Sequence, residues 1–117
     1  MTAHRIRLRR PWHCEPAGEG VRWRRPFNRP TGLGPAQRVW LVLEGLAVAG
    51  TAALNGEALG RLDRDRPECR FDVTDRLQVH NELVVELAAS HPAAQPNSGS
   101  PPGEVSVEIT THDWKRG

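Results

Sequence analysis

Two short stretches of this 117-residue sequence place an aromatic ring beside polar side chains. Trp12 precedes His13, and Trp114 follows His112 and Asp113. A protein site for a sugar needs an aromatic face that stacks on the C–H side of the ring and polar groups that bond its hydroxyls. We therefore predict that Trp12, His13 and Trp114 contact a carbohydrate; the alternative is that each tryptophan packs over a sheet edge.

A second set of polar side chains follows these in the chain. It contains Arg22, Arg24, Arg25, Asn28 and Arg29. The set lies on a predicted strand and the loop after it, where it either lines a groove or forms the solvated face of the strand. Both interpretations stay open, and Arg24 and Asn28 join the candidate binding residues.

The sequence does not indicate catalytic or metal-binding chemistry. It contains neither a GxSxG elbow nor a P-loop, and nothing selects a pair among the strand glutamates for glycoside hydrolysis. The five histidines lack zinc-ligand spacing, and Asp63 with Asp65 lacks the oxygen-rich surroundings that calcium requires. We therefore predict no enzyme activity, no metal site and no cofactor.

Charge is distributed unevenly along the chain. Residues 1–30 carry eight arginines against two glutamates, whereas the remaining residues carry eight basic against twelve acidic side chains. An arginine-rich end occurs in nucleic-acid-binding proteins. Because only one of the 16 basic residues is lysine, we favour a compositional bias of the source genome, and nucleic acid is not an expected partner.

Targeting signals are not evident in the residues given. No stretch approaches the roughly 20 apolar residues of a membrane span, and the first ten residues lack the apolar core of a signal peptide. We expect no membrane association and a cytoplasmic location.

Short strands must position the candidate residues. Alternating apolar residues and turn signals predict strands at 5–10, 21–25, 38–44, 51–54, 57–62, 68–73, 81–89 and 104–111, with loops at 11–20, 27–34, 63–67 and 91–103. The Asn55-Gly56 pair is typical of a two-residue hairpin turn. About eight strands without a helix predict one all-β domain over residues 1–117, an antiparallel β-sandwich of the jelly-roll type.

Two features of the predicted core leave a question for the structure. The strand at 38–44 is apolar on both faces, with Trp40 and Val42 on the second, so something must cover that face. Trp23 and Trp40 are expected in the core. Cys14 and Cys69 either pair across a long loop or remain free thiols, with Cys69 on an inward strand face.

An ordered set of motifs resembles a known family. The set comprises Arg24-Arg25-Pro26-Phe27, VWLVLEG at 39–45, LNG at 54–56, Leu59-Gly60, FDVTD at 71–75, and Asn81 followed by Leu83 and Val85. It resembles the galactose-binding-like jelly roll, in particular the non-catalytic sugar-binding domain on the N-terminal side of glycoside hydrolase family 2 enzymes such as β-galactosidases. Val79-His80 replaces a glycine that this family usually carries shortly before the asparagine.

The resemblance implies a non-catalytic module that binds carbohydrate through loops at one rim of the sandwich. Asp72, Thr74 and Asn81 are expected to bond the backbone of turns and are interpreted as structural. The alternative function is a structural or protein-interaction module, with another protein or a second copy of the chain packed on the sandwich face around Trp40.

Overall fold

The computed structural model describes residues 2–9, 12–18, 20–45, 49–63, 65–88 and 103–111. These residues form nine strands and one 3-10 turn: β1 (Thr2–Arg7), β2 (His13–Ala17), β3 (Gly20–Asn28), β4 (Gln37–Glu44), β5 (Gly50–Leu54), β6 (Glu57–Leu62), β7 (Glu68–Asp72), η1 (Thr74–Arg76), β8 (His80–Ala88) and β9 (Glu104–Thr111). Within these ranges, no helix has the length and apolar character needed to span a membrane.

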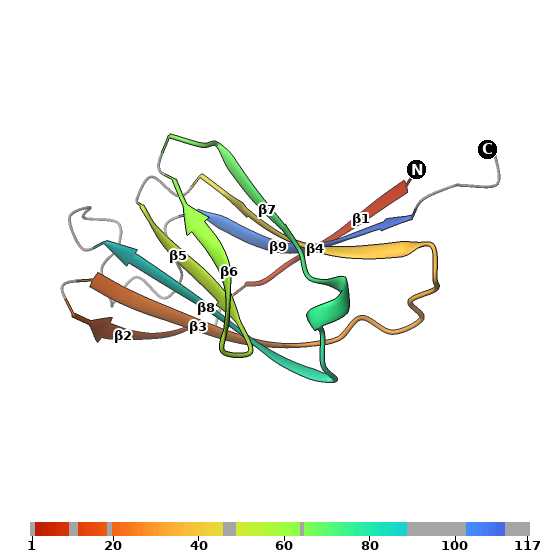
Figure 1. The fold of residues 1–117 in the computed structure, drawn as a ribbon, viewed down its shortest axis with the longest axis horizontal. Coiled ribbons are helices and arrows are strands. Elements are labelled where there is room, and N and C mark those ends of the chain that lie inside the picture. The colour runs from red at the N-terminus through yellow and green to blue at the C-terminus, as the bar shows by residue number, and fades with distance from the viewer. Residues whose placement is uncertain are drawn as a thin grey trace.

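The strands form two antiparallel sheets. Sheet A has the order β1-β9-β4-β7, and sheet B has the order β2-β3-β8-β5-β6. Figure 1 shows the sheets as the two layers of a sandwich, with η1 at one end, on the connection from sheet A to β8 of sheet B. The predicted all-β antiparallel sandwich is confirmed.

The core lies between the two sheets and follows the predicted alternation. Sheet A contributes the inward side chains of Val39, Leu41 and Leu43, and sheet B contributes Trp23 and Leu83, all of which are buried. Side chains one position away along each strand point outward, as the period of two requires. Trp23 therefore lies in the core as expected. The same expectation for Trp40 is wrong: this residue alternates with the inward Val39 and Leu41, and it is only partly buried on the outward face of β4.

Three segments differ from the prediction. The first strand is predicted at residues 5–10, but β1 covers Thr2–Arg7, over which it pairs with β9. Residues 11–20 are predicted as a loop, but His13–Ala17 forms β2, which pairs with β3 from Gly20 to Arg24. As the edge strand of sheet B, β2 tolerates a proline at position 16. The strand at 21–25 also extends further, because beyond Arg24 β3 has a neighbour only on the β8 side and Pro26 lies at a sheet edge.

The predicted turns are confirmed. Asn55 and Gly56 join β5 to β6 with φ angles of 53° and 84°, the positive values that a type I′ hairpin requires. The carboxylate of Asp72 accepts hydrogen bonds from the Thr74 amide at 3.0 Å and the Thr74 hydroxyl at 2.7 Å. That hydroxyl oxygen in turn accepts the Val39 amide at 2.8 Å, so this turn holds η1 against β4.

Asn81 also has the structural role expected of it. Its buried side chain accepts the Gln78 amide at 2.8 Å and donates to the Gln78 carbonyl at 2.9 Å. It also accepts a hydrogen bond from Nδ2 of Asn55 at 3.1 Å. Asn81 therefore ties the start of β8 to the β5–β6 turn.

A layer of charged side chains covers the second apolar face of β4. Glu108 on β9 accepts a hydrogen bond from Nη2 of Arg5 at 2.7 Å and another from Arg70. Because β4 lies between β7 and β9, Arg70 must cross β4 to reach Glu108, and its guanidinium lies 5.2 Å from the centre of the Trp40 ring. Val42 is fully buried on this outer face. We call Arg5, Arg70 and Glu108 the charged layer. The aliphatic parts of these side chains cover the second apolar face of β4, as the sequence required.

Ion pairing in the charged layer shifts the pKa values of Glu108 and Arg5. Hydrogen bonds from Arg70 and then Arg5 hold the pKa of Glu108 below its usual range, although burial opposes this shift. The same hydrogen bond to Glu108 raises the pKa of Arg5. Glu108 and Arg5 are therefore both ionised throughout the neutral range.

The two cysteines are free thiols. Cys14 lies opposite Trp23 in sheet B and Cys69 opposite Leu43 in sheet A, and Cys69 is buried on the inward face as predicted. Burial raises the pKa of the Cys14 thiol, which lowers its reactivity.

Candidate functional site

The candidate site lies where β3 ends and β8 begins, at the end of the sandwich that carries η1 (Figure 1). Asn28, the last residue of β3, lies opposite His80, the first residue of β8. A hydrogen bond of 3.0 Å joins Nδ1 of His80 to Oδ1 of Asn28. The Arg29 amide donates to the Val79 carbonyl at 3.0 Å. Side-chain and backbone bonds thus hold Asn28 at this rim.

A groove of about 440 Å³ opens between β1 and β3 on one side of Asn28; we call it the rim groove. Its lining is apolar at Ile6, Leu8, Pro26, Phe27, Pro30 and Val107, and polar at Arg7, Arg25 and Asn28. The groove is open because β2 pairs with β3 only as far as Arg24, so the last part of β3 has no strand on that side.

A hollow of about 550 Å³ lies on the other side of Asn28; we call it the loop hollow. It is lined by residues 28–33 together with Val79 and His80. Val79 is 71% exposed here, and Ile6 in the rim groove is 43% exposed. Both large hydrophobic residues that the described chain leaves exposed therefore lie in these two depressions, on either side of Asn28.

Positive charge accompanies the apolar lining. Arg25 donates from Nε to the Arg9 carbonyl at 2.8 Å and from Nη1 to the Pro26 carbonyl. Arg7 pairs with Glu104 at 3.2 Å, and both of those side chains are more than half exposed. Within the described ranges, no carboxylate pairs with Arg25. The rim groove therefore presents one guanidinium held by neutral carbonyls and a second in an exposed ion pair.

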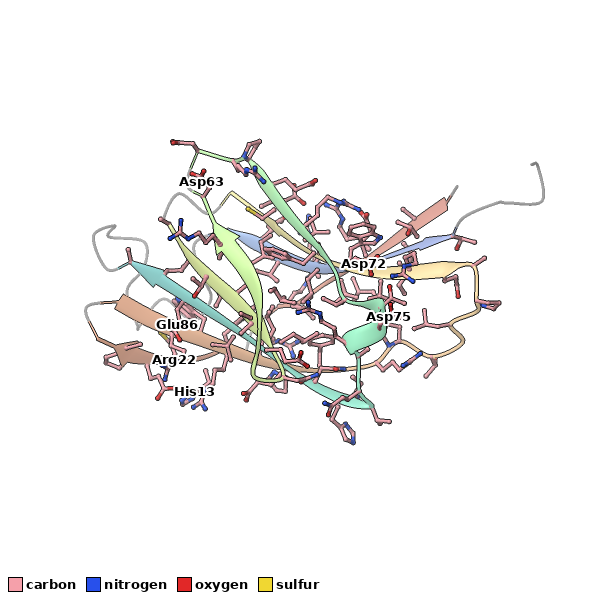
Figure 2. All side chains as sticks on the ribbon, viewed as in Figure 1. His13, Arg22, Asp63, Asp72, Asp75 and Glu86 are labelled. Carbon is pink, nitrogen blue, oxygen red and sulfur yellow. The ribbon has the colours of Figure 1, made fainter. Side chains whose placement is uncertain are left out.

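Two predicted site residues are brought together on the outer face of sheet B. His13 on β2 lies opposite Arg24 on β3, and Arg24 pairs with Glu15 at 3.2 Å. Figure 2 labels His13, Arg22 and Glu86 on the neighbouring strands of sheet B, and Arg22 and Glu86 are joined at 3.1 Å. Nε of Arg24 is a buried atom without a hydrogen-bond partner in the described structure. These side chains form a charged ladder rather than a groove.

Trp12 lies in the core and not on the surface. Only 7% of the residue is exposed, and its indole N–H donates to the Leu8 carbonyl at 3.0 Å. A buried ring leaves no open face on which a sugar could stack. Trp12 directly precedes β2, and the alternation of this strand, continued back by one residue, turns Trp12 and Cys14 inward while His13 points outward.

Trp114 and its neighbours His112 and Asp113 lie outside the described residues, so their predicted role in binding stays a prediction. The same holds for the long loop predicted at 91–103, of which the structure describes only Gly103.

The structure also separates the five polar residues that the sequence grouped together. Arg25 and Asn28 line the rim groove, whereas Arg29 lines the loop hollow. Arg22 and Arg24 lie in ion pairs on the solvated face of sheet B. Arg25, Asn28 and Arg29 therefore line depressions, as the first interpretation has it, whereas Arg22 and Arg24 lie on the solvated strand face, as the second has it.

Sequence reasoning missed the apolar part of the site. Phe27 and Pro30 belong to the loop predicted at 27–34, and Ile6 belongs to the strand predicted at 5–10; the sequence points to none of the three as a binding residue. Pro26 was the residue from which the groove could have been predicted. A proline in a strand indicates a sheet edge, where β3 has no neighbouring strand on one side. Val79 was visible as the residue that stands where the family pattern has glycine.

The arrangement is suited to binding an amphipathic small molecule. Apolar side chains lie beside an amide, an imidazole and guanidinium groups, and the volume of the rim groove falls in the usual range of roughly 300–1,000 Å³ for small-molecule sites. Groups of three or more histidine, cysteine, aspartate or glutamate residues that could hold a metal ion are not found within the described ranges.

Comparison with known proteins supports the fold. A family model described as "Glycosyl hydrolase 2 galactose-binding domain-like" matches residues 16–115. No curated protein matches the chain in sequence.

Several solved structures share the architecture. A β-glucuronidase of Bifidobacterium dentium is 18% identical, with a TM-score of 0.74 over 96% of this chain. A Bacteroides uniformis β-glucuronidase is 14% identical, with a TM-score of 0.73 over 94% of the chain. A putative β-galactosidase from Bacteroides fragilis is 18% identical, with a TM-score of 0.58 over 80%. The chain spans only 31%, 18% and 15% of these proteins, respectively, so the likeness concerns one domain.

Proposed function

The chain belongs to the glycosyl hydrolase 2 galactose-binding domain-like family, and from this premise we propose that it is a non-catalytic accessory module that binds carbohydrate at the rim around Asn28. The observation that carries the proposal is the convergence of two depressions on this one residue. Asn28 supplies an amide with both a donor and an acceptor, which is the chemistry that sugar hydroxyls require.

The rim groove also supplies an apolar surface for the sugar ring. Phe27 is only partly buried, and Ile6 is exposed beside it. Pyranose rings have C–H faces that pack on such side chains, whereas their hydroxyls point toward polar groups at the edge of the site. Phe27 thus takes the place that the sequence suggested for Trp12.

His13 and Arg24 would contact only a longer saccharide. Arg24 and Asn28 lie four residues apart on one face of β3, which corresponds to about 13 Å along a strand. A single sugar ring at Asn28 does not span that distance, but a chain of several rings would. In this proposal the charged ladder of sheet B extends the site, and Trp114 remains a further candidate.

The proposal assigns no catalysis to this domain. Glycoside hydrolysis uses two carboxyl groups that flank the scissile bond. The described linings of the rim groove and the loop hollow contain no carboxylate. The matched solved structures are enzymes, but this chain corresponds to one accessory-type domain of such proteins.

A glycan array tests the proposal directly. The 117-residue chain is displayed multivalently, since single-site affinities of such modules are weak. We expect a defined sugar class to bind, Asn28→Ala to abolish that signal, and the control Gln78→Ala, in an exposed loop, to retain it. Circular dichroism verifies that both variants are folded. A blank array for the unaltered chain would refute the proposal.

A protein-interaction module is a second candidate, which the exposure of Val79 favours. Burying Val79 and Ile6 against a second copy would remove both exposed hydrophobic residues from water. The charged layer already covers Val42 around Trp40, so the rim is the better surface for this function. Light scattering checks it: a monomer at high concentration excludes the homodimer, and a dimer lost in Val79→Ser supports it.

A further inference from the structure

We propose that the saccharide bound in the rim groove carries a carboxylate, as a uronic acid does; this inference rests on the proposed function. The structural reason is Arg25, whose guanidinium lines the groove beside Phe27 and Asn28. The carbonyls of Arg9 and Pro26 hold this side chain in position, but they are neutral, and no carboxylate in the described part of the chain compensates its charge.

Most other arginines on the two sheets differ from Arg25 in this respect. Arg5, Arg22, Arg24, Arg38 and Arg70 each pair with at least one carboxylate within the domain. Arg61 on β6 also lacks a carboxylate partner among the described residues, but it is exposed and lines neither depression. Arg25 lies on the same strand as Arg22 and Arg24, yet no carboxylate of the described residues reaches it. A cation that is partly buried without a counter-charge favours an anionic ligand.

A second guanidinium completes the site. Arg7 lines the same groove, and its pairing with Glu104 is exposed on both sides and hence contributes little. A carboxylate that enters the groove would therefore meet Arg25 directly and could draw Arg7 away from Glu104. Planar carboxylates accept two parallel N–H bonds from a guanidinium, which orients them as well as attracting them.

The apolar wall restricts the anion to one carried on a ring. Ile6 and Phe27 offer a surface that a small inorganic anion would not use, but against which the C–H face of a sugar packs. Ring and carboxylate occur together in a uronic acid. Positive charge, apolar surface and the Asn28 amide thus point to the same class of ligand.

Nuclear magnetic resonance titration of the ¹⁵N-labelled chain tests this inference. The probes are methyl β-D-glucuronide and methyl β-D-glucoside, which differ only by the carboxylate. We expect the glucuronide to bind about tenfold more tightly, as a charge-assisted hydrogen bond implies, and to shift the amides of Ile6, Phe27 and Asn28. Raising the salt concentration should weaken only the charged probe.

Three variants assign the effect to Arg25. Arg25→Ala should reduce the affinity for the glucuronide to that for the glucoside. Arg25→Lys should restore part of the preference, because it keeps the charge but loses the two-pronged geometry. Arg61→Ala, an exposed arginine on β6, is the matched control and should change neither affinity.

The possible outcomes separate this inference from the proposed function. Equal binding of the two probes at the rim overturns the carboxylate inference and leaves carbohydrate binding intact. Glucuronide shifts confined to another surface, or a preference that survives in Arg25→Ala, also overturn it. Absence of binding by both probes together with a blank glycan array would refute both.

Discussion

The outer face of sheet A and the rim around Asn28 both carry arginines, but their surroundings differ. In the charged layer, Arg5 and Arg70 converge on Glu108, which is only 7% exposed. At the rim groove, Arg25 contacts two carbonyls and none of the described carboxylates. In the charged layer, a carboxylate of the same domain neutralises the arginines, whereas at the rim groove no described carboxylate neutralises Arg25.

The two regions differ in the same way in their apolar side chains. Val42 lies beneath the charged layer and is fully buried, although it belongs to an outer strand face. Val79 and Ile6 at the rim are exposed. A surface that the chain covers with its own side chains contributes to stability, and one that it leaves open is available for binding. We therefore expect substitutions in the charged layer to change stability and substitutions at the rim to change binding.

Glu108→Gln should give the largest change in stability. The substitution leaves Arg5 and Arg70 without their shared carboxylate. Breaking a buried pair costs 3–5 kcal/mol, and the partial exposure of both arginines reduces our expectation to about 2 kcal/mol of unfolding free energy. Urea denaturation measures it. Glu104→Gln, on the same face of β9, is the control and should stay within about 0.5 kcal/mol because its ion pair is exposed.

The contribution of Glu108 should disappear in acid. Its pKa in the folded protein lies below the ordinary value of 4.5, so the unfolded chain binds the proton more tightly. The stabilisation is complete above pH 4.5 and is lost as the pH falls through the lowered pKa. The difference between the unaltered chain and Glu108→Gln should therefore shrink in urea titrations from pH 7 to pH 3. A constant difference would mean that packing, not charge, accounts for it.

Val42→Ala should cost about 1.5 kcal/mol, because two buried methyl groups are removed from beneath the charged layer. Val79→Ala removes the same groups from a residue that is 71% exposed, so its unfolding free energy should change by less than about 0.5 kcal/mol. Thermal or urea unfolding compares the two variants. Similar losses would show that Val79 supports the fold, and the rim would then not be a surface reserved for binding.

Local patterns were enough to predict most of the sandwich. Alternation with a period of two is a property of each strand alone, and it places Val39, Leu41 and Leu43 on one face without knowledge of the partner strands. Likewise, Asn55 and Gly56 specify their turn through positive φ angles that few other residues adopt. Such features need no information from distant parts of the chain.

The site depended on information that is not local. The rim groove exists because β2 stops pairing at Arg24, a fact about two strands rather than one. Trp12 was misplaced on a loop because Pro11 and Pro16 outweighed the weak alternation of Trp12, Cys14 and Pro16, which does place the tryptophan inward. Arg22, Arg24 and Arg25 are the same residue type and lie nearly next to one another. Residue type therefore does not show which of the three lacks a carboxylate partner, because the pairing of the strands decides it.

The smallest expected difference in stability is between Arg5→Ala and Arg25→Ala. Each substitution removes one arginine, the first from the charged layer and the second from the rim groove. Arg5→Ala leaves Glu108 with Arg70 alone, and we expect a loss of about 1 kcal/mol for a partly exposed charge-assisted bond. Arg25→Ala frees only two carbonyl groups at the surface, so its change should stay within about 0.5 kcal/mol. Urea unfolding at pH 7 resolves the difference. If Arg25→Ala proved as destabilising as Arg5→Ala, Arg25 would be a structural clamp on β3, and its uncompensated charge would no longer argue for an anionic ligand.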